Sequence, residues 1–311
     1  MVAFRWQIQE RLSDEQPLVT LRELLQHQWL LPKRFVHYLR SRRQVLINQE
    51  YHSVNTVVHP GDQITLLFQG DEFRHPGNNR YLLTTNPHLN ILYENRDLLV
   101  VNKPRGQKSH PNEEGETGTL MNDVAGYLHH QAYMVHRIDL QTSGAVIVAK
   151  NPIVVPILNR FISQGQIHRE YLALVSGHLT GKGEWNWPIG DDPSDPWRRM
   201  VNGKNAQPAQ TFFHVLATNE KYSLVHLRLG TGRTHQLRVH LAHSGHPIVG
   251  DPIYNPESNG GMLLHGRKQR LVLPFSNSQL EITAPLPPYF EQDLLKYHCR
   301  IIKKGDTCCH F

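Results

Sequence analysis

Residues 135–149 read Val135-His136-Arg137-Ile138-Asp139-Leu140-Gln141-Thr142-Ser143-Gly144-Ala145-Val146-Ile147-Val148-Ala149. The second half is a run of small and β-branched apolar residues, which is typical of a buried strand because such side chains fit a two-sided pleated surface. The first half is a polar loop holding Asp139, the only carboxylate between Val124 and Arg169. An isolated carboxylate at the entry to a strand is a candidate functional group.

The spacing leaves two interpretations of Asp139 open. In one, the positive charge of Arg137 holds the carboxylate ionised. In the other, Asp139 forms an Asx-type turn by accepting backbone N–H bonds near Thr142 and Ser143. Spacing alone favours the turn, since structural ion pairs also perturb carboxylates.

Three further segments follow in order: residues 169–175 read REYLALV, residues 232–240 read GRTHQLRVH, and residues 246–251 read HPIVGD. Together with the HRIDxxTSG sequence of residues 136–144, they resemble the motifs of the RluA-type pseudouridine synthases. Ile138 stands where leucine is more usual in that family. The resemblance extends over roughly two thirds of the chain, from about Ile91 to about Pro288.

The resemblance implies an enzyme that isomerises specific uridines to pseudouridine in structured RNA. Large-subunit ribosomal RNA is the favoured substrate, and transfer RNA is the other candidate. Asp139 corresponds to the carboxylate that acts at the ribose of a flipped-out uridine, and Arg238 to its basic partner. Tyr171 corresponds to the tyrosine that stacks on the base, and Arg137 to an arginine that helps extract the uridine. The isomerisation loses no bond energy, so we expect no ATP, metal or redox cofactor.

Two other functions have distinguishable signatures. A non-catalytic RNA-binding or ribosome-assembly protein of the same fold has no need for a carboxylate near phosphates, so Asp139 argues against it. An N-glycosidase would use water to trap the sugar, and it would release free uracil.

Basic side chains near these motifs and near the amino terminus are candidates for phosphate contact. The expected RNA-binding residues are His136, Arg137, Arg233, His235, Lys103, Lys33, Arg34, Arg40, Arg42 and Arg43. His240 and His243 can share a helix face, as some metal ligands do. No carboxylate or cysteine stands beside them until Asp251, so RNA contact or packing is the preferred interpretation and no metal is expected.

The amino-terminal segment is expected to fold separately. Thr20 and Glu23 form a capping-box sequence, which predicts a helix start. A second helix is expected from Pro32, burying Phe35, Val36 and Leu39 and carrying basic residues on its other face. With short strands at 45–48 and 64–68, the segment resembles the small RNA-binding domain first described in a small-subunit ribosomal protein, although the usual Arg-Leu-Asp opening is absent.

From residue 167 onward strands dominate without regular strand–helix alternation. We therefore predict an α+β fold with a mixed, largely antiparallel central sheet, as in pseudouridine synthases, preceded by a small α/β RNA-binding domain. The expected boundaries are 1–68 for the small domain, 69–89 for a linker, 90–295 for the catalytic domain and 296–311 for a basic, disordered tail.

The 311 residues carry a formal net charge of +6, which favours a polyanionic partner. No stretch of 18 apolar residues occurs, and the amino terminus lacks a secretory pattern, so we expect a cytoplasmic protein. The three cysteines, Cys299, Cys308 and Cys309, lie near the carboxyl end, which fits a reducing compartment. A monomer is expected.

Overall fold

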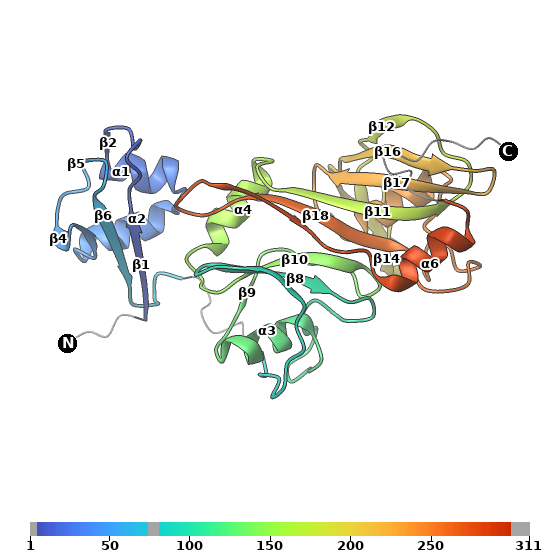
Figure 1. Ribbon diagram of the computed structural model, residues 1–311, viewed down its shortest axis with the longest axis horizontal. Helices are drawn as coiled ribbons and strands as arrows, with labels where there is room; N and C mark the ends of the chain where they lie inside the picture. The colour runs from blue at the N-terminus through green and yellow to red at the C-terminus, as the bar shows by residue number, and fades with distance from the viewer. Residues whose placement is uncertain (1–4, 74–80, 300–311) are drawn as a thin grey trace.

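The chain forms a small amino-terminal unit followed by a long sheet, as Figure 1 shows. This computed structural model describes residues 5–73 and 81–299. The amino-terminal unit lies at one end of the sheet, beside α4 and one end of β18 (Figure 1). No helix within the described ranges has the length and apolar character needed to cross a membrane.

Two sheets and a few helical turns build the amino-terminal unit. Its helical segments are α1 (Leu21–Glu23), a π-helical turn η1 (Leu24–Gln28) and α2 (Lys33–Ser41). A four-stranded sheet has the order β1 (Trp6–Arg11), β6 (Gln63–Phe68), β3 (Val45–Ile47), β4 (Glu50–Tyr51), and β2 (Val19–Thr20) pairs with β5 (Val57–Val58). The predicted capping box is confirmed, because Thr20 Oγ1 accepts from Glu23 N and the Glu23 carboxylate accepts from Thr20 N. Strand β1 was not predicted.

The second helix follows the predicted pattern. Pro32 is its N-cap, and Phe35, Val36 and Leu39 are buried as expected. The boundary at residue 68 is too early, since Phe73 is buried against the rings of Phe35, Phe68 and Trp6. Residues 69–73 therefore belong to the amino-terminal unit.

The larger unit is built on one ten-stranded sheet. Its main order is β12 (Lys182–Trp185), β16 (Thr211–Thr218), β17 (Tyr222–Leu229), β11 (His168–Ser176), β18 (Leu264–Val272), β10 (Ser143–Ala149), β8 (Leu98–Lys103), β7 (Ile91–Glu94), with β19 (Gln279–Thr283) on β18 and β9 (Tyr133–Met134) on β10. Only β10 and β18 pair in parallel within this sheet. The predicted mixed, largely antiparallel sheet in an α+β fold is confirmed.

Helices and a second sheet accompany the large sheet. The helices are α3 (Leu120–Leu128), α4 (Val155–Ser163), α5 (Gln236–His243) and α6 (Pro288–Lys296), and a three-stranded sheet contains β13 (Ile189–Asp192), β14 (Asp195–Val201) and β15 (Lys204–Gln207). Alternate residues of β10 enter different cores: Ala145 and Ile147 pack with α4, whereas Val146 and Val148 pack with α3 and α5. Because both faces are covered, the strand is apolar throughout, as its sequence predicted.

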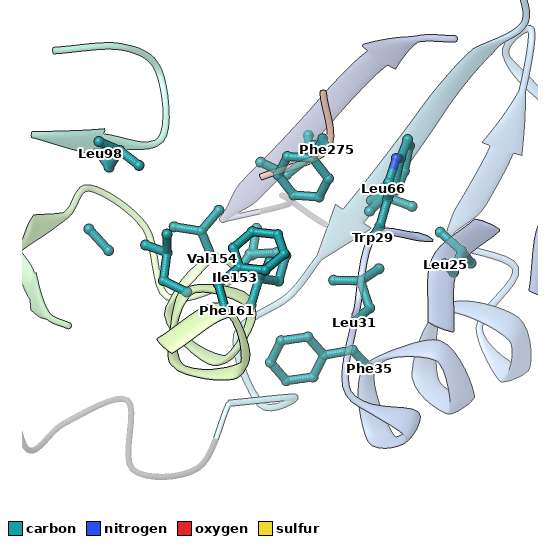
Figure 2. Close-up of a cluster of buried hydrophobic side chains, with 14 of the residues drawn as sticks. Leu25, Trp29, Leu31, Phe35, Leu66, Leu98, Ile153, Val154, Phe161 and Phe275 are labelled. Carbon is teal, nitrogen blue, oxygen red and sulfur yellow. The ribbon is translucent and has the colours of Figure 1, made fainter. Parts of the chain in front are cut away.

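The two units share one hydrophobic core, shown in Figure 2. Trp29 of the amino-terminal unit meets Phe275 edge to face, with ring centroids 5.2 Å apart. Arg160 of α4 donates to the carbonyl oxygen of Leu30 at 2.6 Å. Arg96 pairs with Glu10 at 2.5 Å. Apolar burial combined with these polar contacts fixes the small unit against the sheet.

The carboxyl end departs from the expected disordered tail. Helix α6 runs to Lys296, and Cys299 is buried beside Phe290 and Leu294. The tail expected from residue 296 is therefore wrong for residues 296–299, because this thiol behaves as a small apolar group. Residues 300–311, including Cys308 and Cys309, lie outside the described residues.

Candidate active site

The loop that carries Asp139 is held from both sides. Ser109 Oγ donates to the carbonyl oxygen of Ile138 at 2.7 Å and accepts from Ile138 N at 3.2 Å. On the other side, the carbonyl oxygen of Leu140 accepts from Gly106 N at 2.8 Å. Asp139 therefore projects from a backbone whose neighbouring residues are both tied to the 103–109 segment, which suits a group that must keep one position.

The close approach of β10 and β18 requires a glycine at position 144. Its φ is +115°, and a Cβ there would lie 2.3 Å from the carbonyl oxygen of Gly266. The residue sits in the parallel pairing of β10 with β18, where the two backbones are close. A side chain would separate these strands and move the loop that precedes them.

Asp139 pairs with Arg238 of α5. Its Oδ2 accepts from Arg238 Nη1 at 3.1 Å, and the Asp139 side chain is 28% exposed while that of Arg238 is 4% exposed. The two side chains that were expected to be partners are therefore in direct contact. Arg137 instead donates to Thr234 Oγ1 at 3.3 Å. The carboxylate of Asp139 faces α5. Among the described residues it therefore neither forms an Asx turn nor pairs with Arg137.

A second carboxylate stands behind Arg238. Asp251, which is fully buried, accepts from Arg238 Nε at 2.7 Å and from Nη2 at 2.8 Å. Its Oδ1 also accepts from the backbone N–H groups of Ile253 and Tyr254. One guanidinium therefore bridges two carboxylates, and its pKa is raised by both of them against the effect of burial. Asp251 ends the HPIVGD segment of residues 246–251, but its spacing in the sequence did not indicate this role.

His235 and Tyr254 complete this side of the site. His235 has a φ of 58° at the start of α5, and its Nε2 lies 3.9 Å from Asp139 Oδ2. Its Nδ1 lies 3.1 Å from the hydroxyl of Tyr254. Burial lowers the pKa of His235, with the charge of Asp139 opposing that effect. His235 thus contacts the carboxylate region rather than an open surface.

Tyr171 forms another wall of the same pocket. The pocket encloses about 70 Å³ and is lined by Arg137, Ile138, Asp139, Thr142, Arg169, Tyr171, Leu229, Gly232, Arg233, His235, Gln236, Leu237, Arg238 and Leu264. Arg137 and Arg233 are exposed and lie at its rim, whereas Tyr171 is buried. Burial raises the pKa of Tyr171, so its phenol is neutral at neutral pH.

Two of the residues that were expected to contact RNA, Lys103 and His136, are buried. Lys103 is fully buried, and its Nζ donates to the carbonyl oxygens of Pro104 at 2.9 Å and Gln107 at 2.6 Å. Burial lowers the pKa of Lys103 to about 7. His136 is also buried, and its Nε2 accepts from Ile147 N. Neither side chain can meet a phosphate at the surface, so both support the loop and strand around Asp139.

The basic residues of the amino-terminal unit divide into two groups. Lys33, Arg34, Arg40 and Arg43 are exposed along and just beyond α2. Arg42 is instead engaged by Asp71, through contacts of 2.6 and 2.7 Å, and by Glu72 at 3.1 Å. Because its guanidinium is neutralised within the chain, the expectation that Arg42 contacts RNA is not supported.

The histidines of α5 are used in packing. His240 is buried, with Nδ1 at 3.0 Å from Thr211 Oγ1 and Nε2 at 2.9 Å from the carbonyl oxygen of Trp187. His243 lies against the ring of Trp187, with centroids 4.7 Å apart. The preferred sequence interpretation included this packing role for His240.

Comparison with known proteins matches both units. Residues 97–243 match the family described as RNA pseudouridylate synthase, and residues 9–64 match the RluD ribosomal pseudouridine synthase N-terminal domain. The chain is 39% identical over 259 residues to the uncharacterized RNA pseudouridine synthase YhcT of Bacillus subtilis, covering 79% of this chain and 83% of that one. It is 32% identical over 292 residues to ribosomal large subunit pseudouridine synthase D of Pasteurella multocida, covering 84% and 87%.

A solved structure shares the fold. The structure titled human RNA pseudouridylate synthase domain containing 1 superposes with a TM-score of 0.56 at 29% identity, covering 65% of this chain and 86% of that one. Three of the four sequence motifs, at residues 136–144, 169–175 and 232–240, lie within the family match of residues 97–243, and the HPIVGD segment of residues 246–251 follows that range.

Proposed function

The chain belongs to the RNA pseudouridylate synthase family, and we propose that it uses Asp139 to convert specific uridines of large-subunit ribosomal RNA to pseudouridine. The ribosomal substrate is supported by relatives named ribosomal large subunit pseudouridine synthase D and by the match of residues 9–64. The role of Asp139 is supported by its place in the pocket with Arg238 and Tyr171.

The proposed reaction exchanges one glycosidic bond for another. The N1–C1′ bond breaks, the uracil turns, and a C5–C1′ bond forms, while the proton leaves C5 and N1 regains one. Asp139 acts either as a nucleophile at C1′ or as a base at the 2′ position, and both roles require an ionised carboxylate. The hydrogen bond from Arg238 Nη1 favours that charged form.

Tyr171 supplies a surface for the base. A planar pyrimidine can lie against its ring, and the neutral phenol suits stacking better than proton abstraction. Apolar walls help to exclude the water that would otherwise trap the sugar. These walls are formed by Ile138, Leu229, Leu237 and Leu264.

Eversion of the uridine needs compensation of a few kcal/mol. The exposed rim residues Arg137 and Arg233 are placed to contact the RNA as the nucleotide enters. A second region of contact is the exposed basic face of α2, with Lys33, Arg34 and Arg40. Phosphate contacts at both regions would offset the cost of eversion.

One observation supports this proposal most strongly: Asp139, Tyr171 and Arg238, from three separate parts of the sequence, line one pocket. The test compares pseudouridine maps, obtained by chemical labelling of ribosomal and transfer RNA, in cells with and without this protein. Complementation with the wild type is expected to restore the missing sites, and Asp139→Asn is expected to restore none. Equal restoration by both, at equal protein levels, would contradict the proposal.

A further inference from the structure

Arg169 is a buried cation that the reaction described above does not use. It is 7% exposed and lines the pocket of Asp139 and Tyr171. Within residues 5–73 and 81–299 it forms no ion pair with a carboxylate. Its Nη2 has one long hydrogen bond, at 3.4 Å, to the carbonyl oxygen of Thr231, and its Nε is buried without a partner. An unpaired buried charge opposes folding, so its presence needs an explanation.

The neighbouring carboxylate does not neutralise it. Glu170 follows Arg169 on β11, and successive side chains of a strand point to opposite faces. Glu170 pairs with His226 at 2.9 Å and with Arg270 at 3.3 Å. Its charge is therefore used away from the pocket, whereas Arg169 and Tyr171 point to the same side.

Gly232 leaves space for the guanidinium. A Cβ at residue 232 would lie 2.8 Å from Arg169 Nη1 and 3.2 Å from Nη2. The φ of Gly232 is outside the left-handed region, so its backbone does not require glycine. The absence of a side chain at this position instead allows the Arg169 head group to lie against the 230–234 turn.

Among the described residues, Arg169 lacks the carboxylate partners that Arg238 has in the same pocket. Arg238 is matched by Asp139 and by the buried Asp251. Arg169 is the buried cation of the pocket that the described residues leave unmatched. Uracil and ribose are neutral, so the part of an RNA nucleotide that carries a matching charge is the phosphodiester group.

We propose that Arg169 binds a phosphate group adjacent to the everted uridine. This inference rests on the proposed function and names a positioning contact for it. Along a strand, Arg169 and Tyr171 are about 7 Å apart, which allows one nucleotide to place its base on the tyrosine and its phosphate at the guanidinium. The planar guanidinium, with a free Nε–H, suits the tetrahedral oxygens of a phosphate. The bound phosphate fixes the backbone while C1′ faces Asp139.

The test uses the full-length protein and an unmodified transcript of large-subunit ribosomal RNA. Arg169→Met removes the charge, and Gly232→Ala displaces the guanidinium while keeping it. Arg270→Gln is the matched control, because it removes an arginine on the opposite side of the same strands. Measurements are the Kd for the transcript at several salt concentrations, kcat and KM for pseudouridine formation, and Tm without RNA.

For Arg169→Met we expect the Kd and KM to rise about 10- to 100-fold, as for loss of a charge-assisted contact, with a smaller change in kcat. The slope of log affinity against log salt should fall by about 0.7–0.9, which corresponds to one phosphate contact. Tm should rise by about 2–4 °C, because an unpaired buried charge is removed. Gly232→Ala should weaken binding in the same direction, and Arg270→Gln should leave the salt slope unchanged.

Two results would overturn the phosphate contact: unchanged affinity and slope, or weaker binding with an unchanged slope, which would indicate contact with a base carbonyl. A fall in Tm together with unchanged RNA affinity would assign Arg169 a structural role. If Arg169→Met does not fold, Gly232→Ala decides by the same criteria. Failure of the proposed function is separate, because it appears as absence of pseudouridine formation by the wild type while the affinities and salt slopes still report on Arg169.

Discussion

Asp251→Asn tests whether the bridging guanidinium controls the site. The substitution keeps the size of the side chain and one oxygen, but places an NH₂ group against a donor of Arg238 or of the backbone. Removing one partner of a buried ion pair costs about 3–5 kcal/mol. Arg238 keeps its contact with Asp139, at 3.1 Å, so the lower end of that range applies. For a unit of this size, about 3 kcal/mol corresponds to a fall in Tm of about 6–12 °C.

The same variant should impair catalysis more than binding. Asp251 is fully buried and does not line the pocket, so KM for RNA should change little. Arg238, held by Asp139 alone, is free to turn, and misplacement of a catalytic group by about 1 Å lowers kcat about 100-fold. Single-turnover pseudouridine formation and calorimetry measure the two effects.

The matched control is Glu281→Gln. Glu281 forms comparable contacts with Lys268 and Arg270, but its side chain is 49% exposed. A surface pair of this kind contributes about 0–1 kcal/mol. A Tm for Asp251→Asn within about 2 °C of the wild type, together with unchanged kcat, would refute the reasoning, since buried and exposed pairs would then be equivalent.

Three further predictions follow from burial and charge. Burial lowers the pKa of His136 to about 3 and of His265 to about 4, so the unfolded chain binds protons below pH 6.5 that the folded chain does not. Denaturant titrations at pH 7, 6 and 5 should show that the unfolding free energy decreases as the pH decreases, by about 1 kcal/mol per pH unit for each histidine. His136→Gln should make this pH dependence shallower. Reversing the exposed charges of α2 (Lys33→Glu, Arg34→Glu, Arg40→Glu) should raise KM for RNA and reduce its salt dependence without changing kcat; an unchanged KM would remove α2 from the RNA surface. Phe275→Ala, which deletes the ring against Trp29, should lower the unfolding free energy by about 3 kcal/mol in denaturant titrations, and a loss below about 1 kcal/mol would mean that this contact does not hold the two units together.

Much of the local structure was determined by the sequence alone. The apolar run from residue 143 predicted a strand covered on both faces, and Thr20 with Glu23 predicted a helix start. These are short-range signals, because periodicity and capping act within a few residues. The motif order also identified the family, and with it Asp139, Tyr171 and Arg238 as site candidates.

Tertiary structure alone decided how charged groups are used. Arg238 is 99 residues from Asp139 and 13 from Asp251, yet it bridges both. No sequence pattern indicated that Asp251 is buried, that Lys103 is covered by backbone carbonyls, or that Arg169 lies unpaired in the pocket. Burial and pairing depend on which strands become neighbours, and β10 joins β18 across more than a hundred residues of chain. The identity of a charged residue does not show whether its side chain faces water or another charge. Only the folded sheet decides between these two environments.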